Sequence, residues 1–155
     1  MKFTASFDSF SKIVTAIVVM ALIGVSVASI TNNHGFSYFS IGLIVFMALA
    51  LVVTYGFHPR FYVVNNGTVQ VKSLFRSFTY PKGDISSCDR VDDATMKYSI
   101  RTFGVGGFFG YFGKFYNSKI GSMIWFATQR KNWVLMQTRN GKNIIITPDE
   151  PDALI

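Results

Sequence analysis

The fold is decided near the start of the chain, where residues 13–30 read IVTAIVVMALIGVSVASI. These eighteen residues carry no charge, and residues 41–57, IGLIVFMALALVVTYGF, form a second uncharged run of seventeen. As an α-helix each run would reach roughly 25–27 Å, close to the ~30 Å hydrocarbon core of a bilayer. The sequence therefore predicts a transmembrane helical hairpin within residues 13–58.

Basic residues flank this hairpin at one end only. Lys2 and Lys12 precede the first run, and Arg60, Lys72 and Arg76 follow the second, whereas the ten-residue link TNNHGFSYFS has no formal charge. Lys and Arg accumulate on the cytoplasmic side of membrane proteins. We therefore expect a multi-pass protein of the cytoplasmic membrane with both termini in the cytoplasm.

Three questions stay open in the first 30 residues. Residues 26–28, SVA, fit the cleavage site of a signal peptide as a competing interpretation of the first run. Gly24 and Ala28 form a small-xxx-small pair, which would pack against the second helix or against another copy in a homo-oligomer. In the cytoplasmic segment 1–12, Phe3, Ala5 and Phe7 alternate with polar neighbours. That segment therefore adds a strand to the following domain or lies in the membrane interface.

Charge is concentrated beyond the hairpin. Residues 1–58 hold two lysines and one aspartate, whereas residues 59–155 carry six of the seven net positive charges. A tethered basic residue gains about 1 kcal/mol from an anionic leaflet, so the lipid bilayer rather than nucleic acid is the expected partner. Cys88 is the single cysteine, which excludes an internal disulfide.

From residue 60 the hydrophobic period changes to two. Asn-Gly pairs at Asn66-Gly67 and Asn140-Gly141 supply the positive φ angles that tight hairpin turns require. Short strands with frequent turns predict a cytoplasmic, mainly β domain over residues 59–155, built as a small sandwich or barrel. The predicted strands are residues 61–64, 68–74, 75–80, 85–91, 96–103, 122–129, 133–138 and 142–147.

The glycine-rich stretch GVGGFFGYFGKFY covers residues 104–116. It matches neither a Walker loop nor a dinucleotide fingerprint, because Phe occupies positions 108, 109 and 115 where those motifs need Gly, Gly and Ser or Thr. So many glycines disfavour a regular helix or strand. We therefore expect a bent, partly extended loop.

One side of this loop, with Phe109, Tyr111 and Phe115, is expected to complete the core. The other side should meet the membrane interface or a protein partner, together with basic residues from the same domain. The candidate contact residues are Phe108, Phe112, Lys114, Tyr116, Lys119, Arg130 and Lys131.

No motif in the sequence indicates catalysis. The aspartates between residues 84 and 93 lack the spacing and the central glycine of a calcium loop. His34 and His58 have no partner at the spacing of zinc ligands or of a catalytic triad. We therefore expect a protein that is not an enzyme and that binds neither a metal nor a cofactor.

The two helices, the strand series and the segment GYFGKF at residues 110–115 resemble the bacterial membrane-anchored pleckstrin-homology-like (PH-like) proteins. The resemblance implies a seven-stranded, bent antiparallel sheet closed by a C-terminal helix, of which a short or truncated piece follows Asp149. It also implies a non-catalytic protein-interaction module at the bacterial inner membrane, or alternatively a module that reads the membrane surface. The phosphoinositide site of eukaryotic relatives does not carry over, because the Asn65–Gly67 hairpin is short and uncharged.

The topology predicts a labelling pattern. In intact cells, a cysteine introduced by His34→Cys should react with a membrane-impermeant thiol reagent, because the interhelical link lies outside. Cys88 should react only after the membrane is opened. Labelling of Cys88 but not of the introduced cysteine in intact cells would reverse the orientation.

Overall fold

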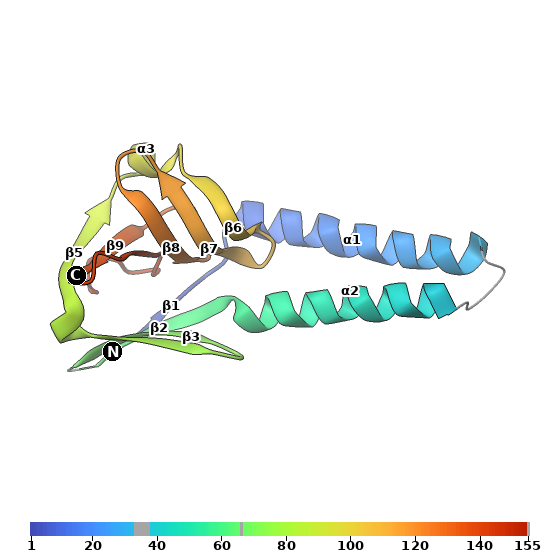
Figure 1. Ribbon diagram of the computed structural model, residues 1–155, viewed down its shortest axis with the longest axis horizontal. Helices are drawn as coiled ribbons and strands as arrows, with labels where there is room; N and C mark the ends of the chain where they lie inside the picture. Colours follow the sequence, from blue (N-terminus) through green and yellow to red (C-terminus); the bar gives the residue numbers. More distant parts are fainter. Residues whose placement is uncertain (33–37, 66, 155) are drawn as a thin grey trace.

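Two long antiparallel helices extend from one end of a β domain in the computed structural model, which describes residues 1–32, 38–65 and 67–154 (Figure 1). α1 spans Ser9–Asn32 and α2 spans Tyr38–Phe57, so both predicted helices are present and each begins a few residues earlier than expected. Both are long and apolar enough to cross a membrane. His34, the site of the labelling prediction, lies outside the described residues.

The surfaces of the two helices are apolar and uncovered. Ile17 and Met20 on α1, and Phe46 and Leu49 on α2, are each more than half exposed. Soluble proteins rarely leave so large an apolar surface in water. The two candidate membrane-spanning helices thus suggest association with a membrane.

Hydroxyl groups, rather than the small-residue pair, mediate the described polar contacts between the helices. Ser29 Oγ donates to Ser40 Oγ at 3.0 Å, and Ser26 Oγ lies 3.7 Å from the sulfur of Met47. Gly24 and Ala28 are exposed, and a Cβ built on Gly24 would meet nothing within 4 Å. The expected packing of this pair against the second helix is therefore wrong, because the serine-bearing face of α1 is turned to α2.

The first sheet contains the N-terminal strand, which is one of the two arrangements that the sequence left open for residues 1–12. Phe3 pairs opposite Tyr62 in an antiparallel register, so the helical hairpin is inserted between two neighbouring strands. The strands lie in sequence order and are β1 (Lys2–Thr4), β2 (Pro59–Asn65), β3 (Thr68–Ser73) and β4 (Ser77–Pro81).

The second sheet has six strands in the order β5-β9-β10-β8-β7-β6, and a short helix, α3 (Asp93–Met96), lies between β5 and β6. β10 pairs with β8 in parallel, and the other pairings are antiparallel. The strands are β5 (Ile85–Val91), β6 (Ile100–Gly107), β7 (Gly110–Asn117), β8 (Gly121–Ala127), β9 (Trp133–Thr138) and β10 (Asn143–Ile146), and a 3-10 turn, η1 (Lys82–Asp84), precedes them.

The predicted PH-like β domain is present, and its sheets are bent and not closed into a barrel. Three details differ from the prediction. The β8–β10 pair is parallel, although antiparallel pairing was expected throughout. Met96 ends α3 instead of opening a strand. After β10, the described residues form a turn in which Leu154 N donates to Pro151 O at 3.1 Å, where a short helix was expected.

The central strands bury both of their faces, because side chains alternate along a strand. Phe126 points into an inter-sheet core between the two sheets, whereas its neighbour Trp125 lies on the opposite face. In the inter-sheet core, the hydroxyl of Tyr62 donates to Phe126 O at 2.6 Å, and burial raises the pKa of this phenol to about 12. We call the opposite face of the six-stranded sheet the pocket face; its buried members are Met96, Tyr111, Phe115, Met123, Trp125, Ala127, Trp133, Leu135 and Ile145.

The glycine-rich stretch is a β-hairpin and not the expected loop. Phe108 and Phe109 form its two-residue turn, and Phe109 has a φ of 52°. Gly104 and Gly113 lie opposite each other with φ angles of 119° and 127°, and a Cβ on either would overlap the carbonyl oxygen of the facing strand. Glycine is thus required here because two backbones meet in a conformation that side chains resist.

This close approach can be tested by adding one methyl group. Gly113→Ala should lower the free energy of unfolding by at least about 2 kcal/mol, since it combines backbone strain with a clash against Phe103 O. Gly83→Ala is the control, because its Cβ would meet nothing within 4 Å; its effect should stay within about 0.5 kcal/mol. Denaturant titration of the full chain in detergent, followed by tryptophan fluorescence, measures both. Equal losses in the two variants would contradict the strained glycine pair.

Candidate functional site

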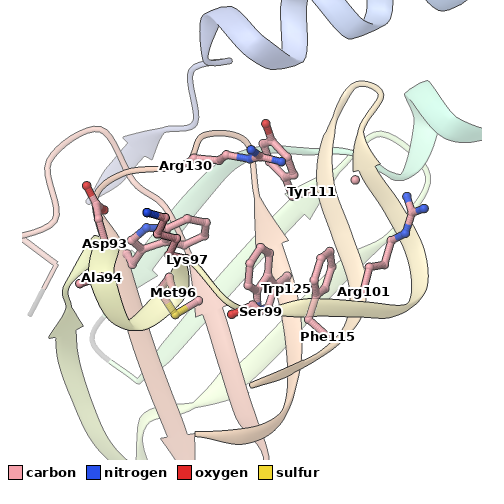
Figure 2. Close-up of a pocket in the computed structure, with 12 residues that line it drawn as sticks. Asp93, Ala94, Met96, Lys97, Ser99, Arg101, Tyr111, Phe115, Trp125 and Arg130 are labelled. Atoms are coloured by element: carbon pink, nitrogen blue, oxygen red, sulfur yellow. The ribbon is translucent and has the colours of Figure 1, made fainter. Parts of the chain in front are cut away.

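A cavity of about 560 Å³ opens on the pocket face, between α3 and the strands β6 to β9 (Figure 2). Its floor is aromatic and is formed by Tyr111, Phe115, Trp125 and Trp133. Cavities of roughly 300–1,000 Å³ lined by aromatic side chains with a few polar groups are the usual form of a ligand site. This cavity is therefore the candidate functional site.

The period-two pattern of β7, β8 and β9 builds the aromatic floor, with β10 lying between β8 and β9 in the sheet. Tyr111 and Phe115 alternate on β7, while Trp125 and Trp133 come from β8 and β9. Phe115 and Trp125 stack with ring centres 3.9 Å apart and planes 7° from parallel, and Trp125 lies 5.0 Å from Trp133. The result is an aromatic floor in which Phe115 and Trp125 are stacked and Trp133 is tilted by 53° to Trp125.

Three basic side chains surround this floor. Lys97 follows α3, Arg101 lies on β6, and Arg130 follows β8, so they approach from different sides (Figure 2). Gly106 makes room for Arg101, because a Cβ there would lie 3.0 Å from Arg101 Nη1. None of the three forms a salt bridge with a residue in the described part of the chain. Asp93 is the one acidic residue of the lining, so the basic groups outnumber it.

Trp125 carries an unpaired hydrogen-bond donor inside the aromatic floor. The residue is 5% exposed, and its indole Nε1 has no acceptor among the described residues. Leaving a buried donor unpaired costs free energy.

Asp8 connects the cavity to the first helix. Its carboxylate accepts hydrogen bonds from Ser11 N at 2.7 Å, from the Tyr111 hydroxyl at 3.2 Å and from Arg130 N at 3.1 Å. The guanidinium of Arg130 also lies over the rings of Phe10, at 4.4 Å, and of Tyr111, at 5.0 Å. Burial and the negative charge of Asp8 raise the pKa of Tyr111, so its hydroxyl stays a proton donor. Asp8 therefore caps α1 and orients two residues of the cavity at once.

The structure separates the contact residues that the sequence predicts. Arg130 lines the cavity, whereas Lys131 beside it lines a separate hollow near Asp149. Phe112, Lys114 and Tyr116 project from the other face of β7, as the alternation with Tyr111 and Phe115 requires. Phe108 is half-buried at the hairpin turn, and Lys119 is exposed beyond β7.

Phe109 does not lie in the core of the β domain, although the sequence predicts it there. It packs at the end of α2, with its ring centre 5.5 Å from that of Tyr55, and it also neighbours the buried His58. Burial lowers the pKa of His58, in agreement with a packing role at this junction. The backbone of Phe109 donates to Thr15 Oγ1 on α1 at 3.0 Å. The hairpin turn thus fastens the domain to both helices.

The cavity itself was not predicted from the sequence. Lys97, Arg101, Trp125 and Trp133 were not singled out, although the alternation of β8 and β9 already puts the two tryptophans on the same face. Matching the buried faces of the predicted strands to each other would have found the aromatic floor. The basic residues around it carry no comparable signal.

The comparison with protein families agrees with this architecture. A family model of the bacterial PH domain matches residues 60–155, which contain β2 through β10. The chain belongs to the bacterial PH domain family. The predicted resemblance is thereby confirmed, while neither a curated protein nor a solved structure matches the chain.

PH-like domains are generally non-catalytic interaction modules. In this PH domain the β2–β3 hairpin, where eukaryotic members often bind phosphoinositides, points away from the helices (Figure 1). The aromatic cavity lies on the other sheet. β1 lies outside the matched residues, yet it completes the first sheet of the PH domain and contributes the buried Phe3 to its core.

The link between Asp8 and the cavity can be measured as stability. Asp8→Ala should lower the free energy of unfolding by about 1–3 kcal/mol, because it removes a helix cap and the acceptor of the Tyr111 hydroxyl. Tyr111→Phe, which loses one of these bonds, should cost about 1 kcal/mol. Asp84→Ala removes an exposed carboxylate and serves as the control. Thermal unfolding of the full chain in detergent measures the loss of stability in each variant, which should be largest for Asp8→Ala and smallest for Asp84→Ala. Equal losses in these two variants would refute the link.

Proposed function

We propose that this protein is a non-catalytic, membrane-tethered interaction module, whose PH domain binds a segment of a protein partner in the aromatic cavity. The observation that supports this most strongly is the combination of an aromatic floor with three basic side chains that lack a salt-bridge partner among the described residues. Such a site favours a ligand with an apolar or aromatic group next to a carboxylate. An acidic residue beside an aromatic one in a protein segment has this chemistry.

The setting of the domain supports a location at the cytoplasmic face of the bacterial inner membrane. β1 precedes α1, β2 follows α2, and the two strands pair, so the N-terminal segment and the PH domain lie on the same side of the helical hairpin. The basic residues Lys2, Arg60 and Arg76 all lie on this side. The positive-inside preference then favours a cytoplasmic location for the whole domain.

The position of the cavity favours a protein segment over a membrane lipid. Its wall is formed in part by α3, which lies on the part of the domain away from the helices (Figure 1). A lipid of the same bilayer would have to extend past Arg130 and Tyr111, which lie beside the first turn of α1, to reach the part of the floor under α3. A partner in the cytoplasm can approach it directly. A module that reads the membrane surface through this cavity is the alternative outcome of the test.

Site-specific photo-crosslinking distinguishes these outcomes. A benzoylphenylalanine residue introduced at Ala94, in the exposed wall of the cavity, should give a discrete protein adduct in living cells. Adding Arg101→Glu should lower the adduct yield about tenfold, equivalent to ~1.4 kcal/mol, because it reverses one of the recognising charges. The same crosslinker at the exposed Lys142, outside the cavity, should not give this adduct.

Two results would contradict the proposal. A phospholipid adduct at Ala94 in place of a protein adduct would favour the lipid-reading alternative. An adduct that persists unchanged with Arg101→Glu, in a variant whose tryptophan fluorescence shows it to be folded, would exclude the cavity as the binding site.

A further inference from the structure

Two large apolar side chains are exposed at the turn between β3 and β4. Leu74 and Phe75 are 53% and 51% exposed. The turn is tight, since Ser73 N donates to Arg76 O at 2.9 Å. Turns of this kind usually present small or polar residues, such as Gly, Asn, Asp and Ser, to water. A neighbouring pair of large apolar residues at this turn would therefore be more stable in a non-aqueous environment than in water.

The turn is fastened to the end of α2. Phe75 N donates to Gly56 O at 3.0 Å, and Ser73 Oγ donates to Phe57 O at 3.0 Å. These donors satisfy two of the carbonyls that a helix C-terminus leaves without intrahelical partners. Figure 1 shows the turn beside the end of α2 where that helix joins the β domain.

Ring contacts fix the orientation of Phe75. Its ring meets that of Phe57 edge-on, with centres 5.8 Å apart. Gly56 provides the space for this ring, because a Cβ built there would overlap it. Phe57 is itself 38% exposed, so the end of α2 and the turn form one partly exposed aromatic surface.

This surface coincides with one end of a candidate membrane-spanning segment, because that segment covers Tyr38–Phe57. Aromatic residues at the end of a span prefer the interfacial region of a bilayer, and basic residues prefer its anionic headgroups. The turn has this composition, since Lys72 and Arg76 flank its apolar pair. By contrast, the β6–β7 turn is already in contact with α1 and α2 through Phe109.

We infer that the β3–β4 turn is a membrane-inserted anchor: Leu74 and Phe75 enter the interfacial layer of the bilayer beside the end of α2, and Arg76 faces anionic lipid headgroups. The inference rests on the proposal that α2 spans the membrane. It assigns the membrane contact of the domain to this turn and not to the glycine-rich hairpin. It also fixes which side of the domain faces the bilayer.

The test uses the full chain, with Cys88→Ser, in vesicles of phosphatidylethanolamine and phosphatidylglycerol. A fluorescent label that reports polarity is attached at Leu74→Cys. The label should emit at shorter wavelength than in water, and spin-labelled lipids with a shallow quencher should quench it more than lipids labelled near the bilayer centre. This order follows if the side chain lies about 5–10 Å into the headgroup and acyl boundary. A label at Arg76→Cys should show a weaker shift in the same direction.

Tyr98→Cys is the matched control, because Tyr98 is also a large exposed side chain, at 74%, but follows α3 away from the helices. Its label should resemble a water-exposed one. A label at Phe46→Cys, near the middle of α2, should be quenched most by the deep lipid quencher. Intrinsic tryptophan fluorescence should match that of the parent protein in every labelled variant.

The outcomes separate this inference from the proposal on which it rests. If the Phe46 label is quenched from the bilayer centre but the Leu74 and Arg76 labels behave like the Tyr98 label, the anchor is overturned and the membrane span stands. If the Phe46 label is not quenched by lipid, both the span and the anchor are overturned. Neither result changes the outcome of crosslinking at the cavity.

Discussion

The carboxylate of Asp8 is a central link between the first helix and the β domain. It caps the first turn of α1 through Ser11 N, and it accepts hydrogen bonds from Tyr111 and from the backbone of Arg130 in the β domain. A second aspartate, Asp149, binds Thr4 and Ser6, which precede Asp8 in the chain. Burial alone would raise the pKa of Asp149, but hydrogen bonds from Thr4, Ser6 and Gln129 hold it below its ordinary value. The segment from Thr4 to Asp8 is therefore hydrogen-bonded to the β domain near both of its ends.

Because of these contacts, the aromatic cavity has a defined orientation relative to the helices. The hairpin of β6 and β7 contributes Arg101, Tyr111 and Phe115 to the cavity, and its turn contacts α1. Ser11 Oγ also donates to Gly107 O at 2.8 Å. A ligand in the cavity and the apolar helices thus share one hairpin as a common wall. Gly104 and Gly113, which lie opposite each other, allow the two strands of the hairpin to approach closely enough to form this wall.

Much of the fold was predictable, because it depends on strong periodic signals. The uncharged runs predicted α1 and α2, and alternation predicted most strands of the PH domain. The glycine-rich stretch was mispredicted because glycine usually weakens strands, whereas here positive φ angles at Gly104 and Gly113 are part of the pairing. The Gly24 and Ala28 pair was misplaced because spacing alone does not reveal which face of a helix meets its neighbour.

The basic residues of the cavity were harder to predict for a geometric reason. The β6–β7 register shifts between Arg101 and Phe103, so Thr102 is an extra residue on β6. This bulge brings Arg101 to the same face as Gly106, although strict alternation would separate them. Lys97 and Arg130 reach the cavity from connections outside the strands. Their convergence depends on the path of the chain between strands, which hydrophobic periodicity does not encode.

The pairing of β1 with β2 has a consequence for how the protein is made. Residues 2–4 are synthesised before their partner strand, which begins only at Pro59, after both helices. The first strand therefore stays unpaired until both apolar helices and β2 have been synthesised. Until it returns, one edge of β2 is open to pairing with other chains, which is a known route to aggregation. Correct placement of the two helices and completion of the first sheet are thus successive steps of one assembly process, and a failure of the first leaves the second unfinished.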